Sequence, residues 1–217
     1  VILRFLEQDG AREVLCDEQV HLFFIEGEKF IKEALCTGAF IETVVVSESF
    51  SSDPRHFELI GMVDNRRIKR VTASSNVFEK ISDTKSPQGI LAVVKMPVVT
   101  LDDIMKKCDS RDAMVIALDF IQDPGNLGTI IRTADAVGAA AVMISENTVD
   151  VYNPKVLRAT MGSVFHIPVY GSRNLPFDIK ILKAAGIRVF AADSKGEVNC
   201  FEADFRGKKI IVIGNES

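Results

Sequence analysis

A loop that leads into a helix-like segment is the part of this sequence best suited to chemistry. The stretch D-P-G-N-L-G-T-I-I-R, residues 123–132, follows the apolar run AMVIALDFI and places two glycines and an asparagine within four positions. Ligands of open α/β sheets collect beyond the carboxyl ends of the strands, and free N–H groups at a helix start favour an anionic or strongly polar ligand. We therefore predict a ligand site at this junction, with Gly125 at a positive φ angle.

Two side chains of this junction have expected roles. Asn126 is expected to cap the helix. Arg132 lies off the apolar stripe of the helix, one turn after Gly128. Because helical side chains lean toward the N-terminus, the sequence predicts that the guanidinium reaches back over the bare Gly128 toward the loop. The alternative is a solvated arginine that pairs with Asp123 or Asp135.

The elements that must position these residues follow from hydrophobic periodicity and from Gly and Pro punctuation. Strand-like and helix-like runs alternate along both halves of the chain, which indicates layered α/β domains with a largely parallel sheet. The expected strands are 21–27, 41–47, 66–73, 89–96, 113–121, 139–145, 163–170, 187–193 and 208–217. The expected helices are 27–38, 51–63, 74–83, 127–138, 153–162 and 176–186.

The chain is long enough for two domains, each with its own core. The stretch VVTLDDIMKKCDSRD turns polar and helical between the two halves. We therefore predict a first domain at 1–97, a linker at 98–112 and a second domain at 113–217.

Composition excludes several classes of protein. No apolar run approaches the roughly 20 residues that cross a bilayer, and the first residues do not form the pattern of a signal peptide. The four cysteines are widely scattered without a C-x-x-C pair, and three isolated histidines offer no metal cluster. We expect free thiols in a reducing cytoplasm, no metal and no membrane. A net charge of −4 argues against a non-specific nucleic-acid coat but allows a local basic patch.

Residues 126–138, N-L-G-T-I-I-R-T-A-D-A-V-G, resemble the first motif of the SpoU-type RNA 2′-O-ribose methyltransferases of the SPOUT class. Further stretches resemble other parts of that family, so the resemblance covers nearly the whole chain. It implies a ribosomal-protein-like α/β RNA-binding domain followed by a SPOUT α/β domain with a parallel sheet and a trefoil knot. The other matching stretches are 23–35, 86–94, 153–169 and 210–217.

The resemblance implies an activity and a set of site residues. The expected reaction is methyl transfer from S-adenosyl-L-methionine to a ribose 2′-hydroxyl of structured RNA. Arg132 is implied as the central catalytic residue, helped by Asn126 and Glu216. The arginine is either a general base or an electrostatic clamp on phosphate, and we favour the clamp because a guanidinium stays protonated in nearly all protein settings. Backbone groups of Ala192 and Gly214 are expected against the adenosine, although Gly214 also reads as a plain turn glycine.

Partners follow from the same resemblance. The additional N-terminal domain is typical of the ribosomal branch, so ribosomal RNA is expected rather than transfer RNA. Members of the family work as dimers, and we expect a homodimer here. The family's third motif, which threads the knot, is absent before Ser217. We therefore expect that the natural protein continues beyond this residue and that the domain at 113–217 is incomplete.

A basic run in the first half is a candidate RNA contact. Arg66, Arg67, Lys69 and Arg70 lie within five positions of an expected edge strand. Such a run either neutralises RNA phosphates, which makes affinity sensitive to salt, or merely protects the strand edge against aggregation. The sequence leaves both interpretations open.

Two other functions compete with methyl transfer. A nucleotide-binding oxidoreductase would use a similar sheet, but the sequence has no G-x-G-x-x-G, and its strand at 139–145 ends in Ser145 rather than in an acidic residue. A non-catalytic RNA-binding relative would keep the fold alone. The joint presence of Asn126, Arg132 and Glu216 argues against that loss of activity.

Overall fold

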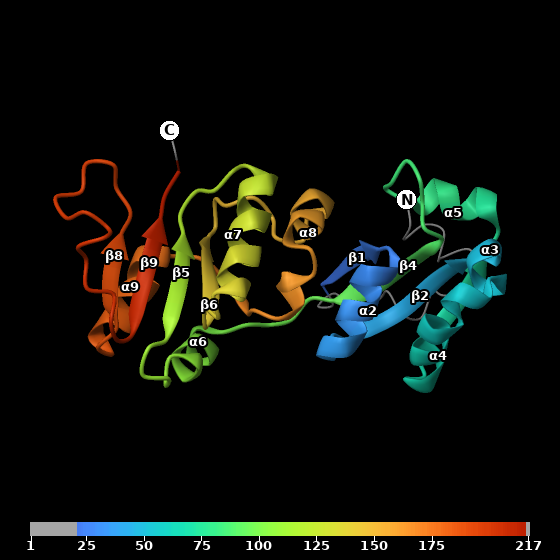
Figure 1. Ribbon diagram of the computed structural model, residues 1–217, viewed down its shortest axis with the longest axis horizontal. Coiled ribbons are helices and arrows are strands. Elements are labelled where there is room, and N and C mark those ends of the chain that lie inside the picture. The colour runs from blue at the N-terminus through green and yellow to red at the C-terminus, as the bar shows by residue number, and fades with distance from the viewer. Residues whose placement is uncertain (1–20, 216–217) are drawn as a thin grey trace. The chain divides into compact units, whose positions relative to one another are not determined.

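A computed structural model describes residues 21–215 of the chain (Figure 1). The chain forms two compact units that divide between Pro97 and Val98. Each unit has its own sheet with helices packed on it, as the alternation of strand-like and helix-like runs predicts.

The first unit has a sheet of four strands in the order β1-β4-β2-β3. β4 pairs antiparallel with both β1 and β2, and only β2 and β3 run parallel. The expectation of a largely parallel sheet is therefore wrong for this half. The elements are β1 (Leu22–Glu26), α2 (Glu28–Thr37), β2 (Ile41–Ser47), α3 (Glu48–Ser52), the 3₁₀ turn η2 (Pro54–His56), α4 (Phe57–Asn65), β3 (Lys69–Ala73), α5 (Ser75–Ile81) and β4 (Ile90–Lys95).

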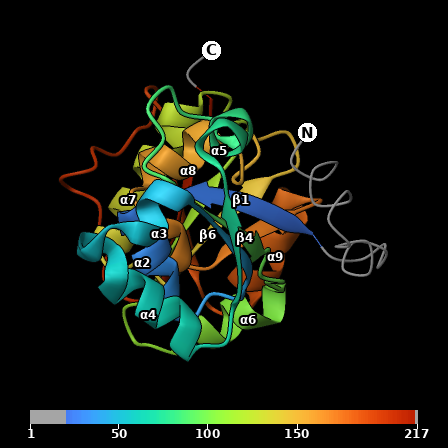
Figure 2. The same ribbon diagram turned by 90° about the vertical axis from the view of Figure 1, so that its right-hand side faces the viewer.

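Helices cover both faces of this sheet. On one face, α2 contacts β1, β4 and α4, and Figure 2 shows α2 and α4 side by side beside β4. On the other face, Phe78 and Ile81 of α5 pack against Val45 and Leu91. Strand side chains alternate between faces, so β2 supplies apolar residues to both layers. β3 is an edge strand, as its alternating sequence predicts.

The second unit has a five-stranded sheet in the order β7-β6-β5-β9-β8, and every neighbouring pair is parallel. This confirms the expected parallel sheet. The elements are α6 (Leu101–Lys107), β5 (Met114–Leu118), α7 (Pro124–Ala136), β6 (Ala141–Ser145), α8 (Pro154–Thr160), the 3₁₀ turn η3 (Ser163–Phe165), β7 (Val169–Ser172), α9 (Leu175–Ala184), β8 (Arg188–Ala191) and β9 (Lys209–Ile213).

The expected strand at 163–170 is only partly a strand. Residues 163–165 form the turn η3, and β7 begins at Val169. Gly162 precedes the turn at a φ of 100°, a left-handed angle that favours glycine. Apolar content alone could not separate this turn from the strand that follows it.

The segment 98–112, expected as a linker, belongs to the second unit. It contains α6, which begins at a capping box in which Thr100 and Asp103 satisfy each other's backbone N–H groups. Ile104 and Cys108 are buried in the main core of this unit, against Val115 and Leu182. The polar residues that suggested a linker form only the exposed side of a short amphipathic helix.

Thiol labelling tests this packing. Burial raises the pKa of the Cys108 thiol, whereas Cys36 and Cys200 are exposed. Because the thiolate is the nucleophile, we expect iodoacetamide at pH 8 to alkylate Cys36 and Cys200 in the native protein and Cys108 only after denaturation. Peptide mass spectrometry resolves the sites. Equal labelling of Cys108 in the native protein would contradict the packing of α6.

Candidate functional site

The loop between β5 and α7 is held at the carboxyl edge of the second sheet. Asp119 donates its N–H to the carbonyl of Ile213 at 2.9 Å, and Phe120 donates its N–H to Ser145 Oγ at 3.0 Å. Phe120 has a φ of 60°, an unusual left-handed angle for a bulky residue. The two hydrogen bonds fix the loop at the edge where a ligand site is expected. Strained residues such as Phe120 concentrate at functional sites, which agrees with that expectation.

Asp123, and not Asn126, caps α7. Its carboxylate accepts the backbone N–H of Asn126 at 2.7 Å, and Pro124 occupies the first helical position. The expected cap by Asn126 is therefore wrong, and the Asn126 side chain is left for other contacts. Gly125 is helical and has no positive φ, contrary to expectation. A side chain there would put its Cβ 3.0 Å from Asp123 Oδ1, so this glycine makes room for the cap.

Gly128 allows two helices to touch. A Cβ at this position would lie 2.4 Å from the Cβ of Ala159 and 2.8 Å from the carbonyl oxygen of Val156, both in α8. The sequence interpretation, in which the arginine side chain folds over this glycine, is wrong because α8 already covers it. The glycine instead fixes α8 against the first turns of α7 (Figure 1). Gly128 therefore influences the position of Arg132 only by fixing α7, the helix that carries both residues.

Arg132 is exposed on α7. Within residues 21–215 its guanidinium forms no ion pair or hydrogen bond, so pairing with Asp123 or Asp135 does not occur. An exposed arginine without a carboxylate partner keeps all its donors for a ligand, and its planar fork suits phosphate.

The expected cofactor residues lie at the same edge of the sheet as the start of α7. β5, β9 and β8 are neighbouring parallel strands, so their carboxyl ends fall together, as Figure 1 shows for β5 and β9. Gly214 follows β9, is exposed and has open space where a side chain would be. Ala192 follows β8, is exposed and donates its N–H to the carbonyl of Val212 at 2.9 Å. Glu216 lies outside the described residues.

The basic run lies in the other unit, at the turn between α4 and β3. Arg66, Arg67, Lys69 and Arg70 are all exposed, and Arg67 has a φ of 55°. Arg70 Nε lies 3.1 Å from Asp64 Oδ1. Such a surface pair contributes little to stability and exchanges readily for another anion.

Sequence reasoning missed two features. The α7–α8 contact had one signal, a glycine opposite an alanine, but a single sequence does not show which helices meet. The second is a polar hollow in the first unit that serine residues line, and no sequence motif marked it.

Other chemistry has little support in the part of the chain that the structure describes. Burial, and then the nearby Asp150 carboxylate, raise the pKa of Tyr152 to about 12, so its phenol stays protonated at neutral pH. Residues 21–215 contain no group of three His, Cys, Asp or Glu side chains placed to hold a metal. Among them, no helix is both long and apolar enough to cross a membrane.

Comparison with known proteins gives two family matches. Residues 113–217 match the model of the SpoU rRNA Methylase family, and residues 18–92 match that of the MRM3-like substrate binding domain. A 23S rRNA (guanosine(2553)-2′-O)-methyltransferase of Bacillus subtilis (strain 168) is 35% identical over 198 residues, which are 91% of this chain and 73% of that protein. Against two further curated relatives the chain spans 50% and 54% of their length.

Solved structures agree with these matches. An rRNA methyltransferase from Sinorhizobium meliloti superposes with a TM-score of 0.80 at 31% identity, over 99% of this chain and 77% of that one. The SpoU methyltransferase AviRb from Streptomyces viridochromogenes, solved in complex with AdoMet, gives 0.79 at 28% identity, over 90% and 74%.

The contact between α7 and α8 yields a stability prediction. We expect Gly128→Ala to lower the free energy of unfolding by about 1–3 kcal/mol, the usual cost of overpacking a tight contact. Ala159→Gly in the same chain should restore part of the loss, because it removes the atom that the new methyl group strikes. Urea denaturation measures both.

Gly171→Ala is the matched control. Gly171 lies in the edge strand β7, and no atom lies within 4 Å of the place that a Cβ would take, so this change should leave the unfolding free energy nearly unaltered. Equal effects of Gly128→Ala and Gly171→Ala would show that the helices do not meet as described.

Proposed function

This chain belongs to the SpoU rRNA methylase family, and on that premise we propose that it transfers a methyl group from S-adenosylmethionine to a ribose 2′-hydroxyl of ribosomal RNA. The observation that carries the proposal is the edge of the second sheet. There the start of α7, capped by Asp123, accompanies the exposed ends of β9 and β8, and Arg132 is exposed further along the same helix with no ion pair or hydrogen bond among residues 21–215. Under this proposal, a phosphate ligand and a cofactor bind at separate places along this edge.

The residues at this edge fit S-adenosylmethionine. Open space at Gly214 lets a flat ring approach the backbone, and the half-buried Ile213 provides apolar surface beside it. The carbonyl of Ala192 and the backbone of Gly214 would hold the adenosine. When bound, the cofactor supplies an electrophilic methyl group on a sulfonium.

The protein's own task is to position the ribose and to manage one proton. A ribose hydroxyl is a weak acid, and its oxygen gains negative charge as its proton leaves. Arg132 binds the adjacent phosphate through its fork and stabilises the developing charge on the 2′-oxygen. The proton passes to solvent or to a phosphate oxygen, because a guanidinium does not act readily as a base. Asn126, free of a capping role, orients the ribose, and Glu216 assists.

We assign RNA binding to the first domain, residues 1–97, and methyl transfer to the second domain. The match of residues 18–92 to a substrate-binding model supports this division. The exposed basic run at 66–70 then neutralises RNA phosphates. Ribosomal RNA is favoured over transfer RNA because a curated relative that matches 91% of this chain carries 23S rRNA in its name.

We further propose a homodimer that works in the cytoplasm. Ile211 and Ile213 of β9 and Phe190 of β8 remain partly exposed, and apolar sheet surface of this kind favours association. The widely spaced free thiols suit a reducing compartment.

Substitution of Arg132 tests the catalytic proposal. We expect Arg132→Ala to lower kcat by about 10²–10³-fold, as for loss of one positioned electrostatic donor. Arg132→Lys should fall between alanine and wild type, because it keeps the charge and loses the fork. The assay is transfer of labelled methyl from S-adenosylmethionine to ribosomal RNA. Calorimetry should show cofactor affinity unchanged.

Arg111→Lys, at another exposed arginine of the second unit, is the control and should retain full turnover. Wild-type turnover in Arg132→Lys would remove any special role for the guanidinium. Binding of RNA without transfer by the wild-type protein would favour the non-catalytic alternative.

Charge reversal tests the basic run. The double variant Arg67→Glu, Arg70→Glu should weaken RNA binding and flatten the dependence of log affinity on log salt by about 1–2, since each lost phosphate contact removes about 0.7–0.9 of slope. Lys106→Glu with Lys107→Glu, on α6, changes the net charge equally and should have a smaller effect. Unchanged affinity and slope in the first variant would show that the basic run does not bind RNA and only protects the edge strand β3 against aggregation.

A further inference from the structure

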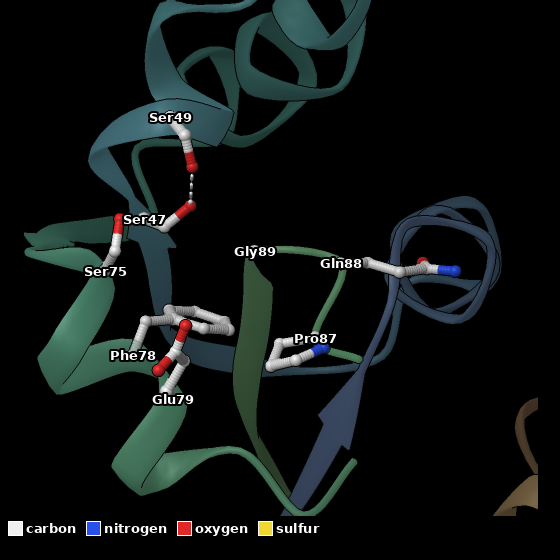
Figure 3. A pocket seen from close by; sticks show the side chains of 8 residues that line it. All are labelled: Ser47, Ser49, Ser75, Phe78, Glu79, Pro87, Gln88 and Gly89. Atoms are coloured by element: carbon white, nitrogen blue, oxygen red, sulfur yellow. Dashed lines mark hydrogen bonds between the residues drawn. The ribbon is translucent and has the colours of Figure 1, made fainter. Parts of the chain in front are cut away.

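A polar hollow of about 150 Å³ lies in the first unit, between the end of β2, the helix α5 and the loop that enters β4. Figure 3 shows Ser47 and Ser49 above it, Ser75, Phe78 and Glu79 on one side, and Pro87 on the other. The hollow has space for about five waters, at about 30 Å³ each. It is half the size of the smallest drug-sized pockets, which begin near 300 Å³. A single ring system fits it, and a whole nucleotide does not.

The fold keeps this hollow open. Gly89 has a φ of 86°, and a Cβ there would lie 2.6 Å from Ser47 Oγ and 3.0 Å from the Cβ of Phe50. The buried Ser47 hydroxyl is fixed because it accepts the N–H of Phe50 at 3.1 Å and lies 3.0 Å from Ser49 Oγ. On the other side, Gln88 accepts the N–H of Glu28 at 3.1 Å, which anchors the loop to α2.

Other contacts hold the preceding loop. Glu26 accepts hydrogen bonds from the hydroxyls of Ser82 and Thr84, both at 2.7 Å, and from the N–H of Asp83 at 3.2 Å. The walls of the hollow are therefore supported from both ends of the loop 82–89.

The chemistry of the lining selects a kind of ligand. The carboxylate of Glu79 and the hydroxyl of Ser75 form no hydrogen bond or ion pair within residues 21–215. A lone carboxylate repels phosphate, and one carboxylate with hydroxyls is a poor ligand set for a hard cation, which takes six to eight oxygens. Phe78 and Pro87 give apolar surface. This combination suits a flat neutral ring that offers N–H donors to Glu79.

We propose that this hollow receives one unstacked guanine base of the RNA substrate, an inference that rests on the proposed function. Guanine alone among the four bases presents two adjacent donors, N1–H and N2–H, which one carboxylate accepts side by side. The hydroxyl of Ser75 donates to O6. Recognition of RNA by single bases that leave the stack is the usual route to sequence specificity.

The basic run strengthens the assignment. It lies at the start of β3, whereas the hollow lies beyond the end of this strand, because Ser47 pairs with Ala73. The two are about 13 Å apart along the strand, at about 3.3 Å per residue. An RNA strand whose phosphates bind the basic run would pass along this sheet edge to the hollow.

Binding of short oligonucleotides tests the proposal. The probes are labelled UUGUU, UUAUU and the inosine analogue UUIUU, which lacks the N2 amino group, and fluorescence anisotropy measures their affinity for the full chain. We expect UUGUU to bind about tenfold more tightly than UUAUU, the discrimination of one bidentate base contact, with UUIUU between them. Glu79→Gln should reduce that preference to within about twofold, and Ser75→Ala should reduce it partly.

The matched control is Glu48→Gln, which removes the same charge from an exposed residue beside the hollow but outside its lining. It should keep the preference for guanine, and thermal melting should show all variants folded. Equal binding of the three probes by the wild type, or a preserved preference in Glu79→Gln, would overturn the proposal.

Methyl transfer to ribosomal RNA, measured in parallel on the wild type, distinguishes failure of the guanine site from failure of the proposed catalytic function. Transfer without a guanine preference overturns the guanine site alone. A guanine preference without transfer supports the base site and overturns the proposed catalytic function.

Discussion

The absent side chain of Gly128 is the constraint on which the second unit depends. It brings α8 so close to α7 that one methyl group would not fit between Gly128 and Ala159. Two helices that touch backbone to side chain have little freedom to slide. The contact lies in the second turn of α7, between the Asp123 cap and Arg132, so it fixes both the loop before the helix and the direction of the residues after it.

Strain beside this contact supports the same conclusion. Phe120 lies just before α7 and Met161 just after α8, and both are non-glycine residues with left-handed φ angles, of 60° and 53°. Each such residue costs of order 1–3 kcal/mol and persists only where the surroundings force it. The hydrogen bond from Phe120 to Ser145 and the packing of the helix pair provide that force. A stiff pair of helices flanked by strained turns is a platform that changes little when a ligand arrives.

The sequence predicted the strands and helices around this platform well, because apolar periodicity and Gly or Pro punctuation are local signals. The helices expected to end at Gly138 and Gly186, for example, do end beside these residues, and both glycines have a positive φ. Prediction from the sequence failed where the role of a residue or segment depended on contacts with residues distant along the chain. A polar side of α6 was taken for a linker because its partners, Val115 and Leu182, lie far along the sequence. The purpose of Gly128 was likewise misjudged, although its importance was recognised, because the helix that covers it is unknown until the chain folds.

The proposed role of Arg132 needs donors that no carboxylate already occupies, and among residues 21–215 its guanidinium has no such partner. Arg55, Arg70 and Arg206 each form an ion pair with an aspartate, and in solution such surface pairs hold the guanidinium only weakly. In the proposed mechanism, a paired arginine would still have to exchange its carboxylate for a phosphate in every cycle. On α7 the Asp123 carboxylate caps the helix through a backbone N–H, so it is already engaged and does not compete with substrate for the arginine. One arrangement therefore has two results. The Asp123 carboxylate caps α7, and because it is engaged there it does not neutralise the Arg132 guanidinium.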